Sequence, residues 1–453
     1  MRGHCQEHGD VNRHFTDTGK GVWPFARQWR AANPPDLVSW TPHLGGTGSA
    51  PGCPMAPKWA LRLRRFVLAG PRRPKRSTRP GYYPGLDGLR GVAVLAVMLY
   101  HCGFIRGGFL GVDMFFTLSG FLITTLLVHE QAATGTICFR NFFARRALRL
   151  MPALFVFLVV WDGFLFTTVP SDYWGIVGLY ALAVFLYVAN WAGIYGLPMG
   201  IFGHAWSLAI EEQFYFIWPA TVALLISKVR RPRLIIGVLA FAALTSLTWR
   251  LGLALSGASE PRIYGATDAH ADGLLVGAAA AFLLASAHRS SERTGYGSSV
   301  PAIIAATGLG GLLLTAAYIP SYAYGASALA AIATVVIILD IVRPGSSLAR
   351  LLEGQWLVWV GRISYGLYLW HFPMFSQFGV LKPPGEMAPP VQGLLAWGAT
   401  FGAAFASYFL IERPALAYKD RFGWVQNDAD ADRPARRHSR EAVELPAVPR
   451  AHA

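Results

Sequence analysis

The 453-residue sequence has little charge, few cysteines and no apolar stretch at its start. Aspartate, glutamate, lysine and arginine together make up only 14% of the chain, well below the share typical of soluble domains. The four cysteines show no CxxC or other metal-ligand spacing, so we expect neither a disulfide framework nor a metal site. The opening "MRGHCQEHGDVNRHF" lacks the apolar core of a signal peptide. These absences argue against a soluble enzyme, a disulfide-rich secreted domain and a zinc protein.

Hydrophobic residues dominate the chain instead. They make up 53% of it, the mean hydropathy is +0.37, and apolar runs near the length of a bilayer crossing recur along the sequence. The net charge is +15, but lysine and arginine gather near the N-terminus and in short links between apolar runs, as the positive-inside rule describes for cytoplasmic segments. We therefore predict an all-α, multi-pass protein of the plasma membrane, with no nucleic-acid partner.

Eleven apolar stretches are candidate spans. If all of them crossed the membrane, the basic links Lys228–Arg233 and His288–Arg293 would lie outside the cell. Treating Trp174–Trp191 as a re-entrant or non-spanning segment returns both links to the cytoplasm. The prediction is thus about ten transmembrane helices plus this one segment, with both termini cytoplasmic.

Composition divides the chain into three parts. Residues 1–79 are basic and without helical or strand periodicity, and we expect a disordered cytoplasmic arm. Residues 80–418 hold all the apolar stretches and form the expected transmembrane domain. Residues 419–453 turn polar and are expected to be a disordered cytoplasmic tail.

Two ionisable residues in the first apolar run need an explanation, because such groups are costly inside a bilayer. Arg90 and His101 in "LDGLRGVAVLAVMLYHC" are eleven positions apart, close to three helical turns. Both side chains therefore lie on one helix face, about 16 Å apart along the axis. Histidine is the side chain suited to proton transfer near neutral pH, so this face predicts a functional site.

Further polar groups lie on other predicted spans. Carboxylates and imidazoles gather toward the outer half, at Asp113, Glu211, Glu212, Asp268, His270, Asp272 and His371. Arginines gather toward the inner half, at Arg90, Arg140, Arg145, Arg146, Arg149 and Arg362. Arg146 and Arg149 are three positions apart, so they share a helix face and can clamp a polyphosphate. The layout predicts an anion site toward the cytoplasm and a proton-transfer site toward the outside.

Six stretches, taken in order, resemble the acyltransferase-3 family of integral membrane acyltransferases. They are Arg90 and His101 with ten residues between them, "GGFLGVDMFFTLSGFLI", "FARRALRLMPA", "WSLAIEEQFYFIWP", "RIYGATDAHADGLLVG" and "GRISYGLYLWHFP". The resemblance implies transfer of an acyl group, expected to be acetyl, from cytoplasmic acyl-CoA to a hydroxyl of a cell-surface glycan, a membrane lipid, a glycolipid or a related metabolite. His270 departs from the family's "TDxR" pattern, which has arginine at that position.

Acyl transfer from a thioester to a hydroxyl needs a base, because the hydroxyl proton must leave as the new bond forms. We assign His101 as this base or as a transient acyl carrier, with Asp113 or Glu211 orienting its ring. Arg90 would steady the thioester or an amide of the pantetheine arm. Arg146 and Arg149 would hold the phosphates of the acyl-CoA donor.

Other interpretations of the same residues stay open. A histidine or carboxylate within a span can be a hydrogen-bonded packing group, and Ser119 and Tyr215 are most simply packing groups. The positive-inside rule alone can explain Arg146 and Arg149. A proton-coupled transporter also has polar groups on several spans, although the sequence shows no corresponding pair of interrupted segments. A lipid-linked sugar transferase would usually carry an acidic metal-binding loop, and no loop here has one.

Overall fold

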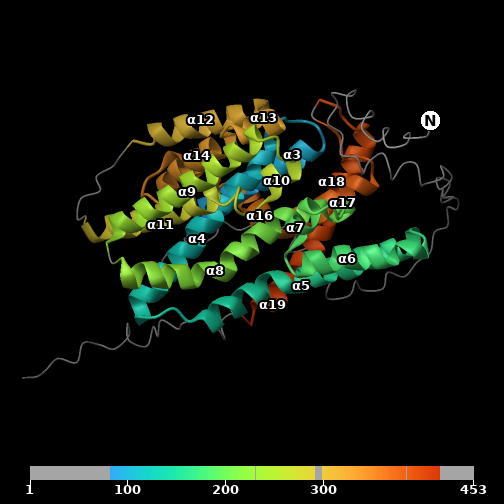
Figure 1. Cartoon of the computed structure of the whole chain (residues 1–453). Coiled ribbons are helices and arrows are strands. Elements are labelled where there is room, and N and C mark those ends of the chain that lie inside the picture. The colour runs from blue at the N-terminus through green and yellow to red at the C-terminus, as the bar shows by residue number, and fades with distance from the viewer. Residues whose placement is uncertain (1–81, 230, 291–297, 384, 419–453) are drawn as a thin grey trace, which may run out of the picture.

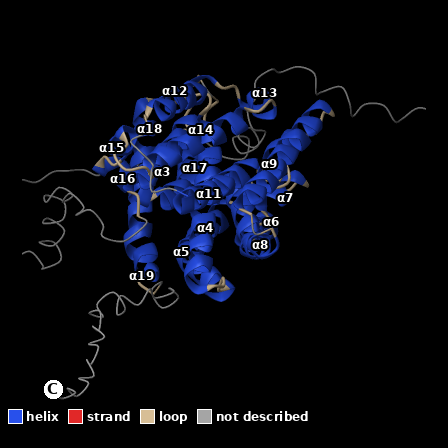
Figure 2. Cartoon of the chain, turned by 90° about the vertical axis from the view of Figure 1, so that its left-hand side faces the viewer, coloured by secondary structure: helices blue, strands red, loops and turns tan. Residues whose placement is uncertain are grey.

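The computed structural model describes residues 82–229, 231–290, 298–383 and 385–418. Every regular element within these ranges is a helix, and Figure 2 shows helices joined by loops with no strand among them. The all-α prediction is therefore confirmed for the described part of the chain. The predicted arm, residues 1–79, and the predicted tail, residues 419–453, lie outside the described residues.

The helices range from single turns to α5, which has 30 residues. Short helices lie between several of the longer ones, so some of the connections are themselves structured. In chain order the α-helices are α3 (Pro84–His101), α4 (Gly111–Thr134), α5 (Phe139–Thr168), α6 (Trp174–Phe185), α7 (Ala189–Ile194), α8 (Trp206–Lys228), α9 (Pro232–Leu255), α10 (Glu260–Gly265), α11 (Asp272–Ser290), α12 (Val300–Thr315), α13 (Tyr318–Ala323), α14 (Ala326–Ile341), α15 (Ser347–Leu352), α16 (Gln355–Arg362), α17 (Ser364–Gln377), α18 (Pro390–Ser407) and α19 (Arg413–Leu416).

Several helices of the described chain have the length and composition of membrane spans. Four are both long and apolar enough to cross a bilayer: Gly108–Thr134, Phe139–Thr168, Pro232–Leu255 and Pro390–Leu416. Shorter apolar helices cover Ser171–Phe185, Asp272–Ala287, Val300–Thr315 and Ala326–Ile341. The helices also cover the apolar stretches identified in the sequence, while the number that cross the membrane stays a prediction.

The helix α3, which carries Arg90 and His101, is surrounded by other helices. It packs against α4, α15, α16 and α17, and most of its residues from Gly85 to Met98 are buried. A second group forms where α11 packs against α4, α9 and α14. In Figure 1 the helices α5 and α6 lie side by side along the edge of the molecule opposite α12. The predicted site residues of α3 and α4 therefore face the interior of the bundle.

Two glycines let α4 and α11 approach closely. A Cβ atom at Gly120 would lie 2.0 Å from the carbonyl oxygen of Leu274, and one at Gly277 would lie 2.0 Å from that of Thr117. No side chain fits at either position, and small residues at such crossings are typical of membrane helices. This contact places Asp113, near the start of α4, beside His270 just before α11.

The segment that the sequence predicts not to span is broken. The helix α6 has 12 residues, which is about 18 Å and well short of the hydrocarbon core of a bilayer. Tyr187 follows with a φ of 54°, and no other non-glycine residue of the described chain has a positive φ. The chain then turns into the short helix α7. A single straight helix over residues 174–191 is thus absent.

Two helices differ from the predicted boundaries. The helix α5 begins at Phe139, well before the apolar run that starts at Leu150, because arginine is a good helix former and the basic link continues the helix. The apolar stretch over residues 356–378, one of the eleven candidate spans, breaks at Ile363 into α16 and α17. As a result, Arg146 and Arg149 lie about two and three turns inside α5, within reach of the bundle.

Candidate active site

Three histidines from different parts of the chain meet at the end of α3. His101 is the last residue of α3, His371 lies on α17, and His204 lies in the turn before α8. The ring centroids of His101 and His371 are 5.1 Å apart, and those of His204 and His371 are 5.6 Å apart. His371 and His204 are buried. From the sequence, His371 is expected toward the outer half of the membrane. The structure brings its ring next to that of His101.

The hydrogen bonds of His101 and His371 determine which ring nitrogen is free. Nδ1 of His101 donates to the carbonyl oxygen of Val97 at 2.9 Å, and Nδ1 of His371 donates to that of Tyr368 at 2.7 Å. A carbonyl oxygen can only accept, so Nδ1 carries the proton in each neutral ring. Nε2 of each ring then bears the lone pair. Both imidazoles are therefore arranged to act as bases or nucleophiles through Nε2.

His204 has no place among the candidates predicted from sequence. Its Nε2 lies 3.1 Å from the carbonyl oxygen of Leu369, on the same helix as His371, and its Nδ1 has no partner within the described chain. The only sequence signal is a polar residue in the apolar stretch "GIFGHAWSLAI". That signal is weak, because a lone histidine in such a stretch is often a packing residue.

In this structure the ring of His101 is oriented by a backbone carbonyl, whereas the sequence predicts a carboxylate in that role. The Nδ1 atom that Asp113 or Glu211 would bind already donates to Val97. Asp113 instead accepts from His270, and Glu211 accepts from Ser119 and Tyr215. The physical reason is local: in the last turn of α3 the carbonyl four residues back is the nearest acceptor for the ring.

A pocket separate from the histidine rings brings Arg90 and Glu211 together. It has about 420 Å³ of empty space, counted with its open mouth, between α3, α4, α8 and α17. Its lining consists of Arg90, Val112, Phe115, Phe116, Ser119, Ser207, Leu208, Glu211, Ser364, Tyr365 and Tyr368. The pocket combines a cation, a carboxylate and several hydroxyls with aromatic walls, which is typical of ligand sites.

Polar contacts hold the two charged groups of this pocket. Arg90 donates to the hydroxyl of Ser364 at 3.4 Å and lies 5.8 Å from the ring centre of Phe115. Glu211 accepts hydrogen bonds from Ser119 and Tyr215, so these two hydroxyls support the carboxylate. The sequence predicts Arg90 toward the inner half of the membrane and Glu211 toward the outer half. In the structure both residues line the same pocket.

The predicted two-arginine phosphate clamp is also altered. Arg146 donates to Glu212 at 2.9 Å, and its guanidinium carbon lies 3.4 Å from the ring centre of Tyr215. An arginine inside a bundle gains more from such partners than from staying free. Arg149 forms no ion pair with any described residue, although it lies within electrostatic reach of Arg90 and Arg146. Arg149 is thus the arginine of the pair that is available to an anion.

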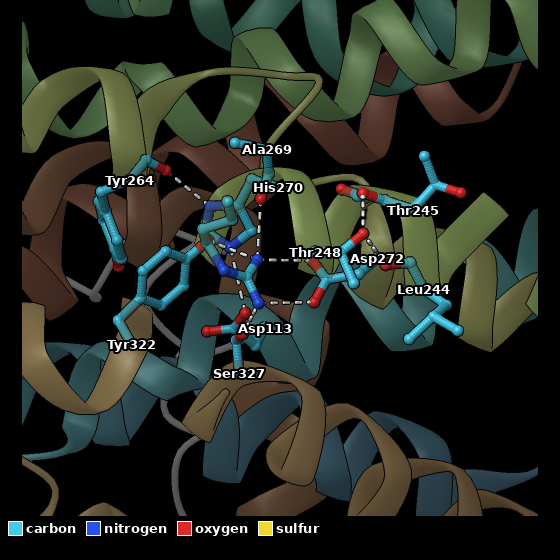
Figure 3. Close-up of polar contacts among 12 residues, drawn as sticks. Asp113, Leu244, Thr245, Thr248, Tyr264, Ala269, His270, Asp272, Tyr322 and Ser327 are labelled. Atoms are coloured by element: carbon cyan, nitrogen blue, oxygen red, sulfur yellow. Dashed lines mark hydrogen bonds and ion pairs between the residues drawn. The ribbon is translucent and has the colours of Figure 1, made fainter. Parts of the chain in front are cut away.

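A second polar cluster is buried among α4, α9, α11 and α14, and Figure 3 shows its side chains converging. Arg250 donates to both carboxylate oxygens of Asp272 at 3.0 Å, and also to Ser327 and Tyr322. Beside it, His270 Nε2 lies 3.1 Å from Asp113 Oδ1, and its Nδ1 donates to the carbonyl of Tyr264. Asp113 and His270 are at most 1% exposed.

This cluster holds one proton between Asp113 and His270. The charges of Arg250 and Asp272 cancel, which leaves the buried Asp113 carboxylate without a fixed countercharge. Nδ1 of His270 donates to a carbonyl, so only a proton between its Nε2 and Asp113 can make their contact a hydrogen bond. Whether that proton sits on nitrogen or oxygen, the four groups together are neutral. A buried cluster is stable only without net charge, because burying an uncompensated charge costs much free energy.

Within the described ranges, no three His, Cys, Asp or Glu side chains are arranged to hold a metal ion. The three histidine rings at the end of α3 are included in this statement.

A bundle of apolar helices that keeps imidazole, arginine and carboxylate groups in its interior is typical of membrane proteins with a functional site among their helices. A family model described as an acyltransferase domain matches residues 83–413, so the chain belongs to the acyltransferase-3 family of O-acyltransferases. The resemblance seen in the sequence is thereby confirmed.

Curated relatives are similar over the same region. The chain is 35% identical over 362 residues to the peptidoglycan O-acetyltransferase OatA of Listeria monocytogenes, covering 75% of this chain and 57% of OatA. It is 34% identical over 360 residues to YrhL of Bacillus subtilis, a proposed peptidoglycan O-acetyltransferase, covering 74% and 55%. A proposed O-acetyltransferase of Staphylococcus aureus strain COL is 34% identical over 349 residues, covering 74% and 57%. The match thus spans little more than half the length of these relatives. No solved structure matches the chain.

The shared proton predicts opposite effects of two substitutions. Asp113→Asn should be tolerated, because the amide can donate to Nε2 of neutral His270 and reproduce a neutral pair. His270→Ala should destabilise the protein by about 3 to 5 kcal/mol, because it leaves a buried carboxylate unpaired. Thermal unfolding of the detergent-purified proteins measures both effects, with Thr245→Ala at an exposed position of α9 as control. Equal melting temperatures for the Asn and Ala variants would contradict the shared proton.

Proposed function

We propose that the chain is an integral membrane O-acetyltransferase that moves an acetyl group from cytoplasmic acetyl-CoA to a hydroxyl of a cell-surface glycan. The observation that carries the proposal is His101, whose Nε2 is free while Nδ1 is held by Val97. The same helix carries Arg90, one wall of the pocket. Membership of the acyltransferase-3 family and the printed names of the relatives support acetyl transfer to a glycan.

His101 would move one proton during the reaction. The acceptor hydroxyl oxygen attacks the thioester carbonyl carbon, a C–O bond forms, and the C–S bond breaks. Nε2 of His101 takes the hydroxyl proton as the attack proceeds and gives it to the departing thiolate. In a two-step version Nε2 attacks the carbonyl carbon first, the C–S bond breaks and CoA leaves as the thiolate; the hydroxyl oxygen then takes the acetyl group as the N–C bond breaks, and its proton ends on the thiolate. Both versions end with an acetyl ester and free CoA.

The donor would approach from the side of α5 that carries the arginines. Arg149 would bind a CoA phosphate, since it has no carboxylate partner in the described chain, and the long pantetheine arm would enter the pocket. There Arg90 and the Ser364 hydroxyl would hold an amide of the arm, and the thioester beyond it would lie nearer His101. Glu211 would serve acceptor binding or steady the hydroxyls around it, in place of the contact with His101 first predicted for it.

The proposal includes the predicted topology of the plasma membrane protein. Ten crossings with both termini in the cytoplasm require that residues 174–191 do not span, and the short helix α6 supports this. In this arrangement the loop from α9 to α11 lies outside the cell. The histidine rings at the end of α3 then lie toward the outer face, where a surface glycan arrives.

His101→Ala should lower kcat for acetyl transfer by about 10²- to 10⁴-fold, because the base is lost. The variant should still accumulate in the membrane, since the substitution makes the span more apolar. Transfer of radiolabelled acetyl from acetyl-CoA to a glycan acceptor measures the effect, and His129→Ala at an exposed position of α4 is the control. Near-normal turnover by His101→Ala would overturn the mechanism.

Arg149→Ala should raise KM for acetyl-CoA by about ten- to hundredfold, the size of one lost charge-assisted contact, and leave KM for the acceptor nearly unchanged. Arg140→Ala, at an exposed position of the same helix, is the matched control. Steady-state kinetics with each substrate varied in turn separates the two constants. If Arg149→Ala leaves the donor KM at its wild-type value, the donor phosphates bind elsewhere.

Ser256→Cys, in a background without the four native cysteines, tests the topology. Ser256 is exposed just after α9. With residues 174–191 not spanning, a membrane-impermeant maleimide should label this cysteine in intact cells. Labelling only after the inner face is opened would mean that residues 174–191 do cross, and the later helices would then have the opposite orientation.

A further inference from the structure

A surface of aromatic and charged side chains lies where α7, the end of α9, α10 and the following loop meet. We call it the aromatic platform; its residues are Trp191, Tyr195, Trp249, Arg262 and Asp268. The rings of Trp191 and Tyr195 are stacked at 6.3 Å with an angle of 26°. The Arg262 guanidinium carbon lies 5.8 Å from the ring centre of Trp191. None of these contacts belongs to the histidine cluster or the pocket.

The two indole rings of the platform are fixed by the protein itself. Trp249 Nε1 donates to Asp268 at 2.9 Å, and Trp191 Nε1 donates to Gln213 at 3.3 Å. A tryptophan that anchors a helix at the membrane interface instead keeps its polar edge at the level of the lipid headgroups. Here the polar edges are used internally, while Trp249 is 50% and Tyr195 83% exposed. The platform thus presents pre-positioned aromatic faces to a partner.

The charges of the platform are balanced. Arg262 donates to both oxygens of Asp268 at 2.7 and 2.6 Å. Burial alone would raise the pKa of Asp268, but the hydrogen bonds from Arg262 and Trp249 outweigh it and lower the pKa below its ordinary value. The pair is partly exposed, at 23% and 44%, and an exposed ion pair is not stable within hydrocarbon. The platform therefore faces water or headgroups, and its zero net charge does not favour a polyanion.

The platform and the histidine cluster lie at the same end of the bundle. The helix α10 carries Arg262 and also Tyr264, whose ring contacts Tyr318 at 4.9 Å. Tyr318 contacts Tyr100 at 6.1 Å, and Tyr100 contacts His101 at 5.2 Å. A continuous series of aromatic rings thus connects the element that carries the platform to the proposed base. A ligand held on the platform would be near the end of the bundle where His101 lies.

We propose that the aromatic platform binds an uncharged polysaccharide strand. Sugar rings have an apolar face of C–H groups that packs on aromatic rings, and their hydroxyls pair with planar charged groups such as Arg262 and Asp268. A neutral surface with fixed aromatic faces fits this chemistry better than it fits a lipid phosphate. The inference rests on the proposed function for the platform's extracellular location and for the glycan as acceptor. The new element of the inference is the surface on which the polysaccharide strand binds.

The test measures binding of chitohexaose, a soluble β-1,4-linked hexamer of N-acetylglucosamine, to the full chain in lipid nanodiscs. Calorimetry gives Kd for the wild type, Tyr195→Ala and Trp249→Ala. Each variant should weaken binding by about tenfold, the usual cost of losing one aromatic contact. Phe241→Ala is the matched control, because Phe241 is 72% exposed on α9 but lies outside the platform. Trp249→Phe should keep part of the affinity, because it retains a ring.

The outcomes separate this inference from the proposed function. An unchanged Kd in both alanine variants, or no hexamer binding by the wild type, overturns the platform. The platform is equally overturned if the variants lower only the melting temperature, because the rings would then be membrane anchors. Consumption of acetyl-CoA without acceptor tests the proposed function separately. Platform-dependent binding by a protein that never consumes acetyl-CoA would support the platform and refute the acyl-transfer proposal.

Discussion

The free energy of placing a charge within a bilayer is the constraint on which the rest of this structure depends. Most interior charges have partners: Arg250 with Asp272, Arg146 with Glu212, and Arg145 with Glu130. Arg90, Arg149 and Glu211 form no ion pair within the described chain. Arg90 and Glu211 face one pocket, and Arg149 lies within electrostatic reach of Arg90. In Arg90 and Glu211 the lack of an ion pair thus coincides with a place in the pocket, where a ligand can supply the missing partner.

Much of the fold follows from the sequence alone. Apolar runs locate the helices, the spacing of Arg90 and His101 puts both on α3, and the conflict among basic links identifies the segment over residues 174–191 as unusual. The six stretches that resemble the acyltransferase-3 family lead to the family that the chain matches over residues 83–413. These inferences use periodicity, composition, and the order of charges and motifs along the chain, which the sequence records directly.

The choice of partners could not be predicted in this way. Asp113 meets His270, 157 positions later, because glycines let α4 and α11 cross closely. Arg146 meets Glu212 because α5 begins well before the apolar run does. His204 joins the cluster only because a turn before α8 reaches α17. Such contacts depend on helix crossings in space, whereas sequence reasoning gives only the depth and the face of each side chain.

The pairing of Asp113 with His270 has a consequence for how the chain is made. The two residues are 157 positions apart, so at about 5 to 20 residues per second α4 is synthesised roughly 8 to 30 s before its partner. During that interval an ionised Asp113, near the end of the span, would carry part of the cost that reaches about 2.5 to 3.5 kcal/mol at a helix centre. Asp113 therefore enters the bilayer most easily as the neutral acid. Its histidine partner is supplied only when the loop before α11 arrives, so until then the inserted helix holds a carboxyl group without that contact.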